Sequence, residues 1–159
     1  MDAATLHRAL EDANKSRALL YLAIYRAAAK RIGHDLAVEI LREAIHGWGA
    51  DQGEGLKCHA PANFEGLVSD FATVPDGGRM FDPHSSAEAP DGLRMHMRRC
   101  PLKNAWTEAG LSDDEIALFC SIAAEADYGT MEQAGFAIDI ETWTPGHEGC
   151  CVLHVRRAR

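Results

Sequence analysis

The sequence predicts an α+β fold in which helices come first and an antiparallel sheet with two inserted helices follows. Apolar residues recur at helical spacing through the first third of the 159-residue chain, whereas three short segments in the second half alternate between apolar and polar residues. A run of helices followed by a group of strands is typical of α+β domains. We expect a single domain over residues 1–159, mainly helical over 1–74 and built from the sheet and its helices over 75–159.

Three helices are expected in the first part of the chain. Residues 16–32 are apolar on most sides, which predicts a central helix that ends at Gly33. Asp35 is the expected cap of a second helix, with an apolar stripe from Leu36 to Trp48. Pro61 is suited to the first turn of a third helix. The buried face of this third helix is expected to consist of Phe64, Leu67, Val68 and Phe71.

The strands are expected in the second half of the chain. The segment Asp82–Gly92 is polar, contains two prolines and has no periodicity, so it is predicted to be a loop. Alternating side chains predict three half-buried strands that form one antiparallel sheet. These strands are Leu93–Met97, Phe136–Ile140 and Cys150–Val155.

Two helices are expected between the first two of these strands. Pro101 is suited to the first turn of one helix, which continues through Trp106. Ser112 and Glu115 have the spacing of a capping box for the other, which is expected to run from Asp113 to about Asp127.

Charge and hydropathy exclude several classes of protein. The net charge of −8 argues against a nucleic-acid-binding protein, which needs a basic surface. The most apolar run, Ala18–Ala29, contains Arg26 and is shorter than the ~20 residues that span a bilayer. Asp2 and Glu11 stand where a secretory signal would be basic. We therefore expect a cytoplasmic protein with no nucleic-acid or membrane partner; its oligomeric state stays open.

The five cysteines are the residues most indicative of chemistry, because in the cytoplasm they would be free thiols. Cys120 and Asp127 are seven residues apart, so two helical turns place them on one face. Cys100 and one of Cys150 and Cys151 can meet them at the sheet. A thiolate group of this kind would suit a soft divalent metal, with zinc the best match. Alternatively, each cysteine is only a small buried side chain.

Other candidate site residues lie on the first predicted strand and the helix after it. His96 is a candidate acid–base group, and Arg94 and Arg98 share its strand face. Arginine binds carboxylates in a bidentate manner, so these two are candidate anchors for an acidic substrate, although a solvated strand face explains them equally well. Trp106 is a candidate pocket residue, or a packing residue.

Five segments of the sequence resemble the L-2-amino-thiazoline-4-carboxylic acid hydrolase family. The resemblance extends upstream through the two helices around Gly33 and covers most of the chain. The segments that carry it are Arg99–Trp106, Ala109–Glu115, Cys120–Ala123, Asp127–Phe136 and Gly149–Leu153.

The resemblance implies a hydrolase that opens or cleaves a C=N or C–N bond in a small cyclic carboxylate, and a site in the C-terminal half. It implies that Cys100, Cys120, Asp127 and one of the final cysteine pair form this site, with Cys151 favoured by its register. A weaker similarity, to vinyl-4-reductase-type domains, implies a non-catalytic small-molecule-binding or sensor module with a structural metal. We expect no nucleotide cofactor in either case.

Two mechanisms are open for the hydrolase. In the first, a metal with one open coordination position activates a water molecule. Its ligands are Cys100, Cys120 and a third residue, with Asp127 and Cys151 as the candidates, and Asp127 is alternatively the general base. In the second, Cys120 attacks the substrate as a thiolate, and Asp127 or His96 transfers the proton. We favour the metal because several cysteines are expected to converge.

Overall fold

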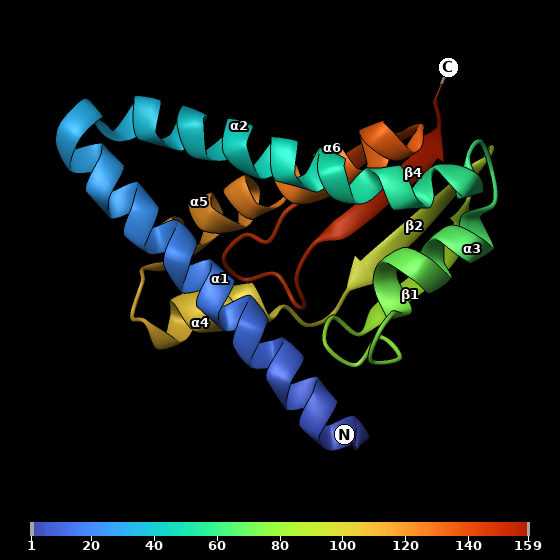
Figure 1. Ribbon diagram of the computed structural model, residues 1–159, viewed down its shortest axis with the longest axis horizontal. Coiled ribbons are helices and arrows are strands. Elements are labelled where there is room, and N and C mark those ends of the chain that lie inside the picture. Colours follow the sequence, from blue (N-terminus) through green and yellow to red (C-terminus); the bar gives the residue numbers. More distant parts are fainter. Residues whose placement is uncertain (1, 159) are drawn as a thin grey trace.

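The long helices α1 (Ala3–Ile32) and α2 (His34–Gly53) form a V that spans the molecule (Figure 1). The computed structural model describes residues 2–158. The remaining helices are α3 (Phe64–Val68), α4 (Pro101–Glu108), α5 (Asp113–Ala123) and α6 (Glu125–Ala134), with a 3₁₀ helix over Glu54–His59 and a π-helical turn over Ser69–Thr73. The strands are β1 (Pro83–Glu88), β2 (Gly92–Met97), β3 (Phe136–Glu141) and β4 (Val152–Arg157). The predicted α+β fold is thereby confirmed.

Gly33 forms the corner of the V. Its φ of 86° is a left-handed conformation that glycine adopts without steric cost, and its N–H donates to the carbonyl of Ala29 at 3.0 Å. The same residue precedes the first turn of α2, so Asp35 lies inside that turn. The prediction of Gly33 as the end of the first helix was correct, and that of Asp35 as a cap was wrong.

The four strands form one antiparallel sheet in the order β1-β2-β4-β3. The three predicted strands share this sheet, although β4 begins and ends two residues later than expected. The predicted loop Asp82–Gly92 was wrong, because it contains β1. This edge strand has four exposed residues between half-buried ends and therefore no alternation, and Pro83 stands at its first position, where an edge strand tolerates proline.

The capping box at the start of α5 is confirmed. The backbone N–H of Ser112 donates to the Glu115 carboxylate at 2.8 Å, and the N–H of Glu115 donates to the Ser112 hydroxyl at 3.3 Å. The helix does not continue to Asp127, however. It ends at Ala123, and α6 continues beyond Asp127 to Ala134. Cys120 and Asp127 therefore lie on consecutive helices.

The first and third helices also differ from expectation. α1 is not central: Leu20 is 57% exposed and Ile24 is 47% exposed, because only the face with Ala18, Tyr21 and Leu22 is buried. The third helix begins at Phe64 after an Asn63 cap, not at Pro61, and the half-buried Phe71 lies on the π-helical turn after it.

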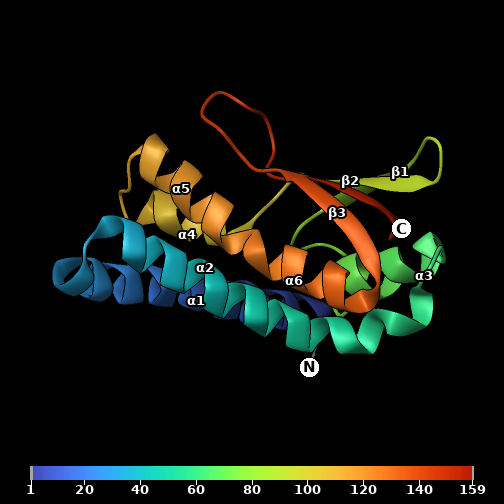
Figure 2. The same ribbon diagram turned by 90° about the horizontal axis from the view of Figure 1, so that it is seen from above.

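The helices and the sheet form layers, with α1 and α2 below, α5 and α6 above them, and the sheet on the far side of α6 (Figure 2). One buried cluster joins α1, α2, α4 and α5 around Trp106 and Phe119, and the other lies between the sheet and α6 around Met95 and Met131. In the described part of the chain, no helix combines the length and the apolar character needed to cross a bilayer.

Candidate active site

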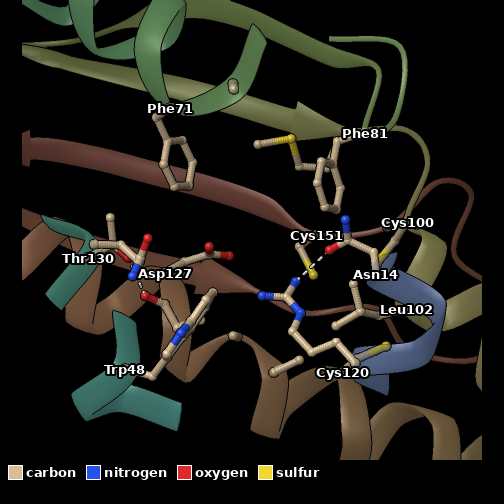
Figure 3. A pocket seen from close by; sticks show the side chains of 18 of the residues that line it. Asn14, Trp48, Phe71, Phe81, Cys100, Leu102, Cys120, Asp127, Thr130 and Cys151 are labelled. Carbon is tan, nitrogen blue, oxygen red and sulfur yellow. Dashed lines mark hydrogen bonds between the residues drawn. The ribbon is translucent and has the colours of Figure 1, made fainter. Parts of the chain in front are cut away.

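A cavity of about 410 Å³ lies where the two buried clusters meet, and we call it the central pocket (Figure 3). Its walls come from α1, α2, α4, α5, α6, the π-helical turn and the segment before β4. The volume is in the range of small-molecule sites. The polar and sulfur-bearing side chains on its walls are Asn14, Arg17, Gln52, Asp70, Met97, Cys100, Cys120, Asp127, Thr130, Cys150 and Cys151.

All four cysteines of the C-terminal half face this pocket. Cys100 precedes the first turn of α4, and Cys120 lies on the last turns of α5. Cys150 and Cys151 lie just before β4, and backbone hydrogen bonds of 2.9 Å to Met97 fix both beside the end of β2. The chain thus brings the predicted residues Cys100, Cys120, Cys151 and Asp127 to the wall of one cavity, together with Cys150.

Cys100 differs from the other thiols in its electrostatic environment. A hydrogen bond from the Cys150 thiol lowers the pKa of Cys100; burial opposes this, and the backbone N–H groups of Lys103 and Leu102 at the start of α4 lower it further. A thiol at a helix N-terminus is a typical position for a reactive cysteine. Cys100 is therefore the pocket thiol best suited to exist as a thiolate.

The remaining pocket thiols are held in the neutral form. Burial raises the pKa of Cys120 and that of Cys151, and a negative charge on Cys100 would raise both further. The hydrogen bond to Cys100 raises the pKa of Cys150, so Cys150 acts as the donor in this pair. This environment disfavours Cys120 as a nucleophile and favours Cys100.

Asp127 brings a buried carboxyl group to the wall of the pocket. It lies in the first turn of α6, and its carboxyl points into the cavity (Figure 3). Burial raises its pKa to about 6, although the positive charge of Arg17 acts in the opposite direction. A carboxyl group with a pKa near neutrality can both donate and accept a proton during a reaction.

Arg17 is a pocket residue that the sequence analysis missed. Its Nη2 donates to Asn14 Oδ1 at 2.8 Å, and its guanidinium lies 5.0 Å from the centre of the Trp48 ring. Its Nε is buried and has no hydrogen-bond partner among the described residues. No pattern in the sequence distinguishes it from the other arginines of α1, Arg8, Arg26 and Arg31. Arg17 is thus suited to bind an anionic group that enters the pocket.

Trp106, a predicted substrate-binding residue, also lines the pocket. Its side chain is fully buried, and its indole N–H donates to the carbonyl of Ala18 at 3.0 Å. This hydrogen bond joins α4 to α1, so the ring acts first as a packing residue and offers the cavity an apolar surface.

Arg94, His96 and Arg98 do not line the central pocket, so their expected roles stay predictions. Strand alternation directs Met95 and Met97 toward α6 and places Arg94 and His96 on the opposite face of the sheet. Arg98 follows the strand and binds the Asp82 carboxylate through Nε at 2.9 Å and Nη2 at 2.7 Å.

The zinc site has no support. Within residues 2–158, no group of three or more histidine, cysteine, aspartate or glutamate side chains is placed to hold a metal ion. The cysteines line the pocket without forming such a group, and we assign no step to a metal.

The comparison with known families agrees with the pocket's position in the chain. The family model for L-2-amino-thiazoline-4-carboxylic acid hydrolase matches residues 13–155. This range begins one residue before Asn14 and ends after Cys151, so it includes every residue that lines the pocket. No curated protein matches the chain.

Proposed function

The chain belongs to the L-2-amino-thiazoline-4-carboxylic acid hydrolase family, and from this premise we propose that it hydrolyses a C=N or C–N bond in a small cyclic carboxylate bound in the central pocket. One observation carries the proposal: a single cavity is lined by the guanidinium of Arg17, the thiol of Cys100 and the carboxyl of Asp127. These groups can bind a carboxylate, attack an electrophilic carbon and transfer protons, respectively.

Arg17 binds the substrate carboxylate. The Nη1 group makes no hydrogen bond within residues 2–158 and is available to the substrate, since Asn14 occupies only Nη2 and the unpaired Nε has no accessible surface. Arg17 is half-buried, so the charge pair is stronger there than at a fully exposed position. The stacking on Trp48 holds the guanidinium in place, which fixes the orientation of the ring relative to Cys100.

Cys100 attacks the carbon of the C=N bond. The new C–S bond forms as the electron pair of the C=N bond moves to the nitrogen, which takes the proton of Asp127. The nitrogen lone pair then re-forms the C=N bond as the bond between this carbon and the ring heteroatom breaks, and the electron pair of the broken bond leaves with the heteroatom. The substrate is now open and bound covalently to Cys100.

Water completes the reaction. The Asp127 carboxylate takes one proton from a water molecule, whose oxygen attacks the same carbon. The C–S bond breaks and returns the electron pair to Cys100, while the second water proton ends on the ring atom that left. The thiolate of Cys100 and the neutral carboxyl of Asp127 are regenerated.

Product analysis tests the function. Purified protein is incubated with L-2-amino-thiazoline-4-carboxylate, and the products are followed by liquid chromatography and mass spectrometry. We expect a product heavier than the substrate by one water, and no such product from the Asp127→Asn variant. Binding of the compound in calorimetry without any turnover would contradict the proposal and favour the non-catalytic binding module.

A further inference from the structure

The two arms of the V carry most of the large hydrophobic side chains that are exposed in the described chain. Eight large hydrophobic side chains are prominently exposed within residues 2–158, and seven of them lie on α1 and α2, at 43% to 57% exposure. We call these seven the V surface: Leu19, Leu20, Ile24, Ile32, Leu36, Ile40 and Trp48. The eighth, Val74, lies elsewhere.

Both helices contribute to this surface with helical spacing. Leu20 and Ile24 are one turn apart on α1, and Leu36 and Ile40 are one turn apart on α2. Trp48 is rotated by about 120° from Leu36 and lies at the edge of this surface, on the side of the central pocket. The opposite faces of the two helices are buried against α4, α5 and α6. In Figure 2 the two helices form the outermost layer on this side. Each helix is therefore apolar on two faces, although the fold covers only one.

The area of the V surface matches a protein interface. With roughly 150–200 Å² for each fully exposed side chain of this size, seven half-exposed side chains present roughly 600 Å² of apolar area, against about 800 Å² of total area per partner in a standard interface. This area is at the upper end of the range of about 300–600 Å² for the largest apolar patch of a typical monomer, a patch that is often functional. This surface is large enough to hold a second protein.

The charges beside the V surface are self-complementary. The end of α1 carries exposed basic residues, and the start of α2 carries exposed acidic ones. The basic group is Arg26, Lys30 and Arg31, and the acidic group is Asp35, Glu39 and Glu43. No salt bridge joins the two groups within residues 2–158. A two-fold axis brings each group opposite its counterpart in another copy, as a symmetric interface requires.

We propose that the V surface binds a second copy of this chain, with the basic end of α1 in each copy against the acidic start of α2 in the other. Trp48 belongs both to this surface and to the wall of the central pocket. The V surface thus borders the pocket at Trp48.

Sedimentation velocity of the full chain between about 1 and 100 µM tests the proposal. We expect a species of twice the chain mass of 17.3 kDa. The double variant Leu20→Glu/Ile40→Glu should sediment as a monomer, because it places charges at the middle of the interface. Val74→Glu is the matched control: it also charges an exposed apolar position, but one outside the V surface, and it should remain dimeric.

Charge reversal tests the orientation. Glu39→Lys/Glu43→Lys should weaken the dimer about tenfold, and adding Arg26→Glu/Arg31→Glu should restore it. Circular dichroism checks that each variant is folded. A monomeric wild type would overturn the proposal, and co-sedimentation of that monomer with phosphatidylcholine vesicles would assign the V surface to a lipid. A Leu20→Glu/Ile40→Glu variant that is folded and still dimeric would also overturn it.

Discussion

Arg17 and Asp127 line the same cavity from different helices, yet their opposite charges form no salt bridge within the described chain. The guanidinium lowers the pKa of the carboxyl, but burial outweighs it and raises this pKa to about 6. The pair therefore leaves Asp127 able to exchange protons near neutral pH and leaves Arg17 able to bind another anion. This separation of roles is the basis of the proposed hydrolysis.

Arg17→Ala should reduce kcat/KM at least roughly 30-fold, the effect of about 2 kcal/mol from a lost buried contact with a substrate carboxylate. An analogue without the carboxylate separates this role from a structural one. The kcat/KM of wild type should be about 30-fold lower for this analogue than for the carboxylate substrate. The kcat/KM of Arg17→Ala should be similar for both compounds. Arg8→Ala, an exposed arginine on the same helix, is the control. If wild type and Arg17→Ala prefer the carboxylate substrate over the analogue by the same factor, Arg17 does not bind the substrate carboxylate.

Asp127→Asn should abolish turnover and make stability less dependent on pH. The pKa of this carboxyl rises from 3.8 to about 6 on folding, so the folded state binds more protons than the unfolded state between these values. Wild type should thus lose up to about 3 kcal/mol of stability as pH rises through this window. The Asn variant should not lose it.

Urea unfolding at pH 4 and pH 7.5, at fixed protein concentration, measures this difference. The stability of Asp127→Asn relative to wild type should increase between the two pH values. Asp113→Asn, in the first turn of α5 on the surface, is a control for the loss of a carboxylate. A relative stability of Asp127→Asn that does not change with pH would show that the carboxyl is not perturbed by burial.

Cys100 should be the pocket thiol that reacts fastest with iodoacetamide at pH 7, because only its pKa is lowered. Peptide mapping in a Cys58→Ser background measures this, since Cys58 is exposed and would react as well. Cys150→Ala removes the hydrogen bond to the Cys100 sulfur and should slow its alkylation. Faster modification of Cys120 would contradict the assignment of the nucleophile.

Phe136→Ala should destabilise the protein by about 3–5 kcal/mol, because this ring is fully buried between the sheet and α6. Phe71→Ala should lower the free energy of unfolding by less than half of that amount. Helical spacing predicted Phe71 as a core residue, but its ring is half-buried and faces the pocket (Figure 3). Chemical unfolding compares the two variants, and equal losses would show that Phe71 is part of the packed core.

Local patterns in the sequence were sufficient for most elements of the fold. The Ser112–Glu115 capping box and the alternation in β2 and β3 are properties of neighbouring residues, and both predictions were correct. β1 was missed because an exposed edge strand buries no face. The exposed positions on α1 were missed because apolar residues on all sides of a helix do not reveal what covers them.

The site could be predicted only in part. The family resemblance pointed to Cys100, Cys120, Asp127 and Cys151, which all line the pocket, while their roles remain predictions. It did not distinguish Cys100 from Cys120, because the difference depends on the hydrogen bond from Cys150 and the start of α4. Arg17 was missed for a similar reason: it reaches the pocket from a helix distant in the sequence.

The most direct test of the account compares turnover of L-2-amino-thiazoline-4-carboxylate by three matched variants, Cys100→Ser, Cys120→Ser and Cys58→Ser. We expect a loss of at least about 10³-fold in kcat for Cys100→Ser, because a hydroxyl at this position is not ionised at neutral pH. The loss should be below tenfold for Cys120→Ser, and kcat should not change for the exposed Cys58→Ser. A folded Cys100→Ser variant with turnover within a few-fold of wild type would contradict the assignment of Cys100 as the nucleophile.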